Sequence, residues 1–183
     1  ELYLRAFGAP SISIEDMGII STPTDFLGVN YYSRAVVKAD PEAQPLELSH
    51  VRTNRPVTAM GWEVYPEGLY DLLLRIEQDY DPPAVFITEN GAAYDDQVSS
   101  GGLVDDRERM EYIRAHLIQL HRAMQDGVEV EGYYLWSILD NFEWAFGYSK
   151  RFGIVYVDYT TLKRIPKSSA RWYRSVIERG SVL

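Results

Sequence analysis

A glutamate stands at the point where an apolar run of the chain breaks into a turn. Glu89 follows the apolar residues 85–87 and precedes Asn90 and Gly91. If residues 84–88 form a buried parallel strand, this carboxylate lies at the strand's carboxyl end, where α/β barrels place their catalytic groups. Such a group can attack an electrophilic carbon or exchange a proton. The alternative is an ordinary turn in which asparagine and glycine supply positive φ angles, and local sequence alone favours that alternative.

A second group of candidate residues is associated with the apolar run 133–138. Trp136 lies within this run, and Glu143 and Trp144 follow within one loop. A sugar needs both kinds of side chain, because the C–H face of a pyranose packs on an aromatic ring while its hydroxyls donate to a carboxylate. An aromatic cluster that packs the domain core explains the composition equally well. Both interpretations stay open at this level.

A third group lies at the end of the first apolar run. Asn30 and Tyr32 follow the run 26–29. Taken alone, this pattern indicates a strand that ends in polar aromatic residues at an interface. The three groups share one arrangement, with polar and aromatic side chains placed at or just after the end of an apolar run.

The elements that must position these residues follow from the hydrophobic pattern. The runs 26–29, 84–88 and 133–138 predict buried parallel strands. A first helix is expected after Pro66, a second from a capping-box-like start at Asp105 and Glu108 to Gly127, and a third after Pro166. The residues expected to face the core are Leu69, Leu72, Leu73 and Ile76, then Met110, Ile113, Leu117, Leu120 and Met124, then Trp172, Tyr173, Val176 and Ile177.

This alternation of strands and helices predicts a parallel α/β fold. Only three strong strands are present, which is too few to close a (β/α)8 barrel. Residues 34–55, which include Pro41 and Pro45, are interpreted as a long loop with one hairpin. Residues 154–157 and 161–164 predict a second small hairpin after the third strand.

Charge and composition exclude several classes of partner. The formal net charge of -9 would repel a phosphate backbone, so no nucleic-acid partner is expected. Cysteine is absent, which excludes a thiolate metal site and favours a reducing, cytoplasmic location. No stretch approaches the length of a transmembrane helix, so no membrane partner is expected. His116 and His121 are five positions apart, on different faces of a helix, and neither a metal nor a cofactor is expected.

In this combination and order, the three strings resemble the β-glycosidases of glycoside hydrolase family 1. Residues 86–91, Phe-Ile-Thr-Glu-Asn-Gly, are similar to the family's nucleophile motif, and the similarity runs from about residue 16 to residue 177. The resemblance implies that Glu89 is the catalytic nucleophile, that Tyr32 hydrogen-bonds it and that Asn30 supports the site. The residues that it implies for binding the non-reducing sugar, the glycone, are Trp136, Glu143, Trp144 and Phe152.

One motif of the family is missing. The family carries its acid/base glutamate in a Thr-x-Asn-Glu-Pro string on the fourth barrel strand, and no such string occurs in this sequence. The resemblance therefore implies that residues 1–183 are the carboxy-terminal part of a (β/α)8 barrel, about strands six to eight with their helices, without the amino-terminal part. Residues 1–8 would be the remnant of the helix before strand six.

The activity implied by the resemblance is hydrolysis of terminal non-reducing β-D-glucosides by a retaining double displacement, with galactosides and fucosides also accepted. This mechanism needs two carboxyl groups about 5–5.5 Å apart. Glu89 supplies one of them. Glu143, Glu63 and Glu131 are candidates for the second, but the resemblance assigns Glu143 to binding and gives the other two no catalytic place. The acid/base group is therefore expected from the missing half, and the chain alone is expected to be nearly inactive.

Two other functions stay open. The chain could be a non-catalytic half-barrel scaffold, natural or engineered, that self-associates, or a sugar-binding module that uses Trp136, Glu143 and Trp144 without chemistry. A three-stranded arc leaves two parallel edges unpaired, which favours association. The expected partners are a β-glycoside substrate and either a complementary amino-terminal half-barrel chain or further copies of the same chain.

Overall fold

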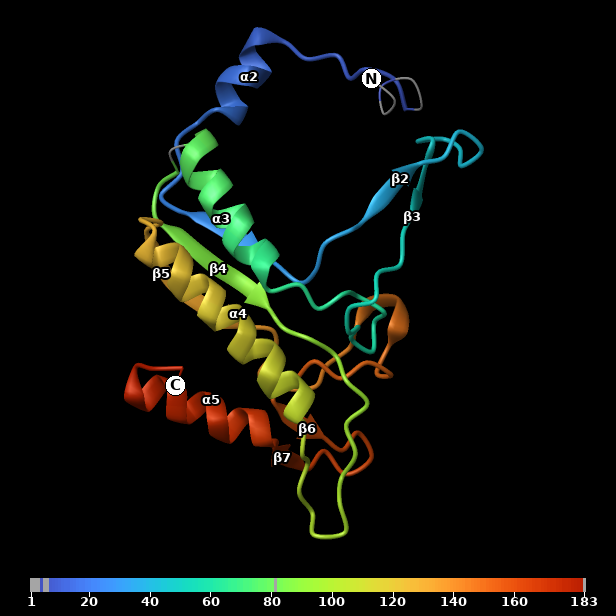
Figure 1. The fold of residues 1–183 in the computed structure, drawn as a ribbon, viewed down its shortest axis with the longest axis vertical. Coiled ribbons are helices and arrows are strands. Elements are labelled where there is room, and N and C mark those ends of the chain that lie inside the picture. Colours follow the sequence, from blue (N-terminus) through green and yellow to red (C-terminus); the bar gives the residue numbers. More distant parts are fainter. Residues whose placement is uncertain (1–3, 5–6, 81, 183) are drawn as a thin grey trace. The chain divides into compact units, whose positions relative to one another are not determined.

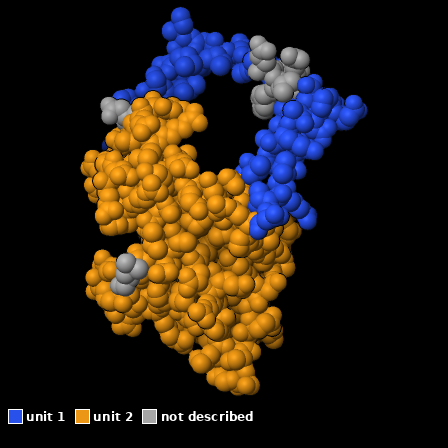
Figure 2. All heavy atoms as spheres, viewed as in Figure 1, with its two compact units in different colours: residues 1–25, 35–54 blue, residues 26–34, 55–183 orange. Residues whose placement is uncertain are grey.

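The structure, a computed structural model, describes residues 4, 7–80 and 82–182. The chain divides into two compact units (Figure 2), one made of the described residues of 1–25 and 35–54, the other of 26–34 and 55–183. All of the candidate site residues lie in the second unit. None of the described helices is long and apolar enough to cross a membrane.

The second unit is built on a parallel sheet of three strands (Figure 1). These are β1 (Leu27–Asn30), β4 (Val85–Asn90) and β5 (Val130–Leu135), in the order β1-β4-β5. The helix α3 (Glu67–Tyr80) connects β1 to β4, α4 (Arg107–Gln125) connects β4 to β5, and α5 (Ser168–Arg179) comes last. The predicted α/β alternation with three parallel strands is therefore confirmed. Both β1 and β5 are edge strands of this sheet in the described part of the chain.

The third strand differs from its prediction because it begins at Val130 and ends at Leu135. Trp136 lies just beyond it, and the Trp136 N–H still donates to the carbonyl of Asn90 at 2.9 Å. The pairing of β4 with β5 is irregular between Ile87 and Asn90 and resumes with Asn90 opposite Leu135. The peptide bond between Trp136 and Ser137 is cis.

The main core lies between the sheet and the helices α3 and α4. Val85 and Ile87 on β4 pack with Leu69 and Leu73 of α3 and with Leu120 of α4. Because side chains alternate along a strand, Phe86 and Thr88 face the other way. With Phe26 and Tyr134 they line a pocket of about 460 Å³.

The first predicted helix is confirmed, while the start of the second is corrected. Leu69 and Leu73 are fully buried, with Leu72 and Ile76 packed against the same core. The helix α4 is capped by Asp106 rather than Asp105, and the Asp106 side chain makes no capping hydrogen bond. The expected capping box at Asp105 and Glu108 is therefore wrong, because the neighbouring Asp106 takes the cap position and uses its carboxylate elsewhere.

The predicted apolar stripes of α4 and α5 are correct only in part. Ile113 and Leu120 are buried on α4, whereas Met124 is 46% exposed. On α5, Val176 is buried but Ile177 is 65% exposed, which contradicts its predicted inward position. The buried residues of α4 that the predicted stripe does not contain are Arg109, Tyr112, His116 and Ala123. The helix ends at Gln125, and the stop predicted at Gly127 is confirmed by a φ of 105° there.

The second unit also contains the predicted hairpin after the third strand. It pairs β6 (Val155–Val157) with β7 (Arg164–Pro166) in antiparallel fashion, so its second strand lies later than residues 161–164. A short 3-10 helix, η1 (Trp144–Phe146), lies in the loop between β5 and β6.

The first unit contains the hairpin that was expected in residues 34–55. Its strands are β2 (Val37–Ala39) and β3 (Leu48–His50). A helix that the sequence pattern did not predict, α2 (Ile14–Ile20), begins with a capping box between Ser13 and Asp16. The helix remnant expected at residues 1–8 falls largely on residues outside the described part of the chain.

Candidate active site

The candidate residues gather at the carboxyl edge of the parallel sheet. Glu89 is the next-to-last residue of β4, and Asn30, the last residue of β1, is its register partner. Trp136 follows the last residue of β5. Because parallel strands end at the same edge, residues from each of the three groups identified in the sequence lie at that edge.

The Glu89 carboxylate accepts a hydrogen bond from a tyrosine that lies two residues beyond the end of the adjacent strand, β1. The Tyr32 hydroxyl donates to Glu89 Oε2 at 2.5 Å. Burial, together with this contact, raises the pKa of Tyr32 well above its ordinary value, so the hydroxyl keeps its proton and acts as a donor. Glu89 Oε1 has no hydrogen-bond partner among the described residues, which leaves one carboxylate oxygen available to an electrophile.

Asn30 lies at the same edge but contacts a different residue. The Thr88 hydroxyl donates to Asn30 Oδ1 at 2.6 Å, and the Asn30 side chain is otherwise exposed. No hydrogen bond joins Asn30 to Glu89 among the described side chains. The support that the resemblance implies for Asn30 stays a prediction.

The residues after Glu89 do not form the turn that local sequence favoured. Asn90 is the last residue of β4 and is fully buried. Its Nδ2 donates to the Tyr31 carbonyl at 2.7 Å, and its Oδ1 accepts from the Tyr133 hydroxyl at 2.7 Å. Gly91 is required by packing, since a Cβ atom there would lie 1.7 Å from the carbonyl oxygen of Trp136. The motif therefore joins β4 tightly to its neighbours on both sides.

A second tyrosine, which the sequence analysis missed, supports this strand end. Tyr112 on α4 is 2% exposed, and its hydroxyl donates to the Tyr32 carbonyl at 2.8 Å. The same oxygen lies 3.3 Å from Asn90 Nδ2. The only sequence signal was a polar aromatic residue beside Ile113 in the apolar stripe of a helix.

An aromatic cluster borders the carboxylate. The ring centroids of Tyr32 and Trp62 are 5.4 Å apart, and both rings lie 6.1 Å from the ring of Phe152. Phe152 is 2% exposed and therefore forms part of the site's packed wall. Trp62 was missed because it lies in the connection between β3 and α3, where no apolar periodicity marks it.

The loop after β5 carries the second candidate carboxylate. Glu143 is 9% exposed, and its N–H donates to the Gly147 carbonyl at 2.7 Å. Burial, and then the charge of Glu89, raise the pKa of Glu143. The adjacent Trp144 is 80% exposed, while Trp136 is half-buried. The structure thus brings Glu143 into the electrostatic field of Glu89 and leaves the Trp144 ring open to a ligand.

The other glutamates considered as a second catalytic carboxyl lie in different surroundings. Glu63 is buried and forms a two-point ion pair with Arg34, with Nε–Oε2 at 3.0 Å and Nη2–Oε1 at 3.1 Å. Arg55 approaches Glu63 at 3.6 Å. Glu131 is exposed on β5. Two arginine side chains thus form ion pairs with the Glu63 carboxylate, so this group is poorly suited to donate a proton.

The described residues contain no group of three or more histidine, cysteine or acidic side chains that could hold a metal ion. His116 is fully buried on α4, and its Nδ1 lies 2.7 Å from the Tyr112 carbonyl, whereas His121 is exposed. The two histidines therefore lie on different faces of the helix, as their spacing predicts.

A parallel α/β sheet with carboxylates at its carboxyl edge is typical of α/β barrel enzymes. A comparison with family models gives the family. The chain belongs to glycosyl hydrolase family 1, whose model matches residues 3–181.

Two individual relatives are named as a glucan glucohydrolase and as a glucosidase that is also a fucosidase. The chain is 56% identical over 168 residues to a 1,4-beta-D-glucan glucohydrolase of Thermotoga neapolitana, covering 92% of the chain and 38% of the relative. It is 41% identical over 178 residues to a bifunctional beta-D-glucosidase/beta-D-fucosidase of Bifidobacterium breve, covering 88% of the chain and 39% of the relative.

Solved structures give the same result. A family 1 β-glucosidase from Thermotoga maritima has a TM-score of 0.93 and 51% identity, covering 99% of this chain and 41% of that one. The same enzyme in complex with noeuromycin has a TM-score of 0.92 and 49% identity, covering 98% of this chain and 41% of that one. The chain thus spans about two-fifths of the length of the relatives that it matches.

Proposed function

We propose that this chain forms the carboxy-terminal part of a β-glucosidase barrel, about strands six to eight, and that it hydrolyses terminal β-D-glucosides when the amino-terminal barrel part is present. The observation that carries the proposal is the Glu89 carboxylate, which the Tyr32 hydroxyl holds at a strand end and whose charge acts on a buried second carboxylate, Glu143. Below, the completed enzyme means this chain together with the amino-terminal part, on the same or a second polypeptide.

In the proposed first step, Glu89 attacks the anomeric carbon of the glucoside. A bond forms between a Glu89 oxygen and that carbon, the bond to the leaving oxygen breaks, and an acid group donates a proton to this oxygen. Oε1 of Glu89 suits this role because it has no hydrogen-bond partner among the described side chains. Tyr32 holds Oε2 and so orients the carboxylate for attack.

In the second step, water attacks the glycosyl-enzyme ester and releases Glu89 with retention of configuration. The group that donated the first proton accepts one from this water. Among the described glutamates, Glu63 is paired with arginine and Glu143 is assigned to the sugar. We therefore assign the acid/base role to the amino-terminal part.

The glycone is assigned to the loop after β5. The half-buried Trp136 and the exposed Trp144 supply aromatic surface, and the buried Phe152 closes the wall. Glu143 would accept hydrogen bonds from sugar hydroxyls, and such bonds to a carboxylate are stronger than neutral ones. The relative from Bifidobacterium breve, a glucosidase and fucosidase, supports acceptance of more than one sugar.

The need for an amino-terminal part is supported by the sheet itself. The edge strands β1 and β5 each have a neighbour on one side only in the described part of the chain. Phe26 and Tyr134 are 52% and 58% exposed on the face that the pocket occupies. An apolar face beside two unpaired parallel edges is better suited to contact with further barrel strands than to exposure to water.

The nucleophile assignment is tested by Glu89→Ala in the completed enzyme. We expect hydrolysis of an aryl β-glucoside to fall by a factor on the order of 10⁴ or more, because no covalent intermediate can form. External azide should restore turnover and yield the glycosyl azide of inverted configuration. Glu131→Ala, an exposed glutamate on the neighbouring strand, is the matched control and should keep full activity. Full activity in Glu89→Ala would end the assignment.

A further inference from the structure

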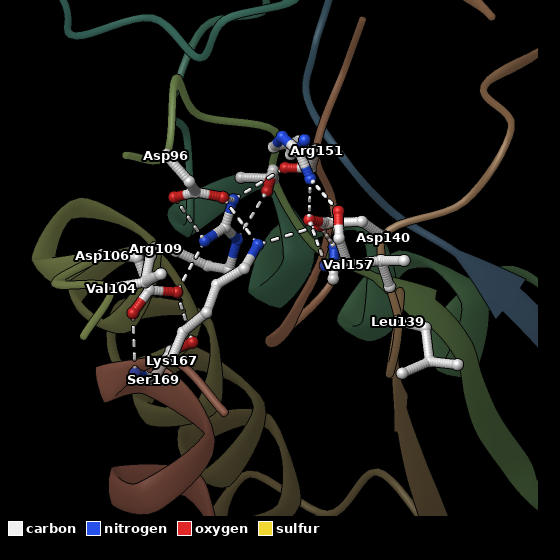
Figure 3. A network of polar contacts seen from close by, with 12 residues as sticks. Asp96, Val104, Asp106, Arg109, Leu139, Asp140, Arg151, Val157, Lys167 and Ser169 are labelled. Carbon is white, nitrogen blue, oxygen red and sulfur yellow. Dashed lines mark hydrogen bonds and ion pairs between the residues drawn. The ribbon is translucent and has the colours of Figure 1, made fainter. Parts of the chain in front are cut away.

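The second unit contains a buried network of charged side chains (Figure 3). It balances three carboxylates against three cations, and all but one of the side chains are at most 2% exposed, the exception at 18% being Arg151. Buried charges are costly unless they are paired and hydrogen-bonded. The members are Asp96, Asp106, Arg109, Asp140, Arg151 and Lys167.

Arg109 on α4 is the centre of one half of the network. Its guanidinium donates to both Asp96 oxygens at 3.0 and 2.8 Å and to Asp106 Oδ2 at 2.5 Å. It also donates to the carbonyls of Ala92 at 3.1 Å and Arg151 at 2.7 Å. These contacts use all five N–H groups of the side chain, so Arg109 ties the chain leaving β4 to the loop after β5.

Lys167, just before α5, joins this half to the other. Its Nζ donates to Asp96 Oδ2 at 2.6 Å and to Asp140 Oδ1 at 2.9 Å. Asp140 in turn accepts from Arg151 Nη1 at 2.6 Å and from the Gly153 N–H at 3.0 Å. Gly153 has no room for a side chain, since a Cβ atom would lie 2.1 Å from the Asp140 nitrogen.

The ion pair of Asp140 with Arg151 closes the base of the loop formed by residues 141–150. This loop carries Glu143 and Trp144. On the other side, Arg109 holds the carbonyl of Ala92, three residues after Glu89. The network is thus a side-chain connection between the segment that follows Glu89 and the base of the loop that carries Glu143.

We propose that Arg151 and Lys167 are positioning residues that set the place of Glu143 relative to Glu89 and thereby control recognition of the outer sugar hydroxyls. The inference rests on the proposed function. A purely stabilising role would not require charges, because apolar side chains of similar volume often stabilise a core as well or better. Hydrogen bonds from a planar guanidinium and a lysine are directional, so they hold a loop in one position. Apolar contacts have no such direction and fix the position of a loop less precisely.

The first test measures amide hydrogen exchange in the chain by itself. The variants are Arg151→Lys and Lys167→Met. The matched control is Arg174→Met, whose exposed side chain on α5 pairs with Glu178 and with no other described residue. We expect the amides of Glu143, Phe146 and Gly147 to exchange about tenfold faster or more in the two variants, with β4 amides unchanged. Equal acceleration in β4, or no acceleration in the loop, would overturn the inference.

The second test compares an aryl β-glucoside with its 4-deoxy analogue in the completed enzyme. We expect the preference in kcat/KM for the 4-hydroxyl to fall about tenfold or more in Arg151→Lys and Lys167→Met, as in the reference variant Glu143→Gln, and to persist in Arg174→Met. Variants that slow both substrates equally would overturn the positioning role. If Glu143→Gln itself keeps the preference, the proposed sugar-binding role of Glu143 fails, and the exchange experiment still decides whether the network positions the loop.

Discussion

Glu89 and Glu143 are two carboxylates at one site, and their mutual repulsion has a measurable consequence for the fold. Burial and the Glu89 charge raise the pKa of Glu143 in the folded chain above its value in the unfolded chain. The folded state therefore binds the Glu143 proton more tightly than the unfolded state does. As pH rises from the unfolded-state pKa through the folded-state pKa of Glu143, its contribution to the free energy of unfolding falls. A functional carboxylate that destabilises its own fold at neutral pH is a common feature of active sites.

We therefore predict that Glu143→Gln stabilises the chain near neutral pH. The substitution removes a buried charge, so the free energy of unfolding should exceed that of the parent near pH 7 and equal it at a pH below the ordinary glutamate value. Urea unfolding at the two pH values measures the difference. Glu131→Gln, at an exposed position on β5, should show no comparable gain. A Glu143→Gln variant that is less stable at neutral pH would contradict the expected sign.

A second prediction at this scale concerns Trp144 and the charge of the substrate. Trp144 stands directly after Glu143 and is 80% exposed. If the sugar binds as proposed, the Trp144 indole would occupy the space that a 6-phosphate needs. We expect the completed enzyme to prefer an unphosphorylated aryl β-glucoside over its 6-phosphate by about tenfold or more in kcat/KM. Trp144→Ala should narrow that preference. A clear preference of the parent enzyme for the 6-phosphate would contradict the assignment of an unphosphorylated glucoside as the substrate.

At the scale of elements, α4 serves both the core and the site. Tyr112 supports the end of β4 through its hydroxyl, while His116, one turn later, stacks on the Tyr112 ring at 4.0 Å. His116 Nδ1 contacts the Tyr112 carbonyl, which can only accept, so Nδ1 carries the proton and Nε2 is the unprotonated nitrogen. Nε2 is buried and has no hydrogen-bond partner within the described part of the chain.

We predict that His116 makes the chain sensitive to mild acid. Burial lowers the pKa of His116 from 6.5 to about 4, so the unfolded chain binds the proton first as pH falls. The stabilising contribution is complete above about pH 6.5 and is lost as pH falls toward about 4, a change on the order of 3 kcal/mol. His116→Leu should remove this slope from urea unfolding between these pH values. His121→Leu, at an exposed position on the same helix, should retain it, and an unchanged slope in His116→Leu would contradict the assignment.

At the scale of the whole molecule, the second unit presents the open side of its sheet. The helices cover one face, while Phe26, Phe86, Thr88 and Tyr134 line the pocket on the other. Apolar surface left in water costs about 25 cal/mol per Å², so a few hundred square ångströms are comparable with a large part of a domain's stability. Association is the simplest way to recover that free energy.

We therefore predict that the chain alone associates at micromolar concentration. Sedimentation should show oligomers, and the double variant Phe26→Lys with Tyr134→Lys should shift the population toward monomer. Ile177→Lys, which replaces an exposed apolar residue on α5 away from the sheet, should leave the association unchanged. A compact monomer of the parent chain with cooperative unfolding and ordinary glucosidase turnover would contradict this view.

Local sequence patterns were sufficient to predict the strands and most of the helices, and to identify the main candidate residues. Glu89, Asn30 and Trp136 could be placed because each stands at or next to the end of an apolar run, and parallel strands end at a common edge. Leu69 and Leu73 followed from helical periodicity, because burial of one helix face imposes that period. The family was recognisable for the same reason, since its motifs are short strings at strand ends.

Only the tertiary structure decided contacts between residues far apart in the chain. The sequence pattern predicted Asp105 as the cap of α4, but Asp106 takes that position, and its carboxylate contacts Ser169 and Arg109 in the folded chain. Lys167 contacts Asp96 across 71 positions. A periodic pattern records which face of an element is buried. It does not record which polar group another element brings to that face, and this is why Trp62, Tyr112 and the buried ion network came from the structure alone.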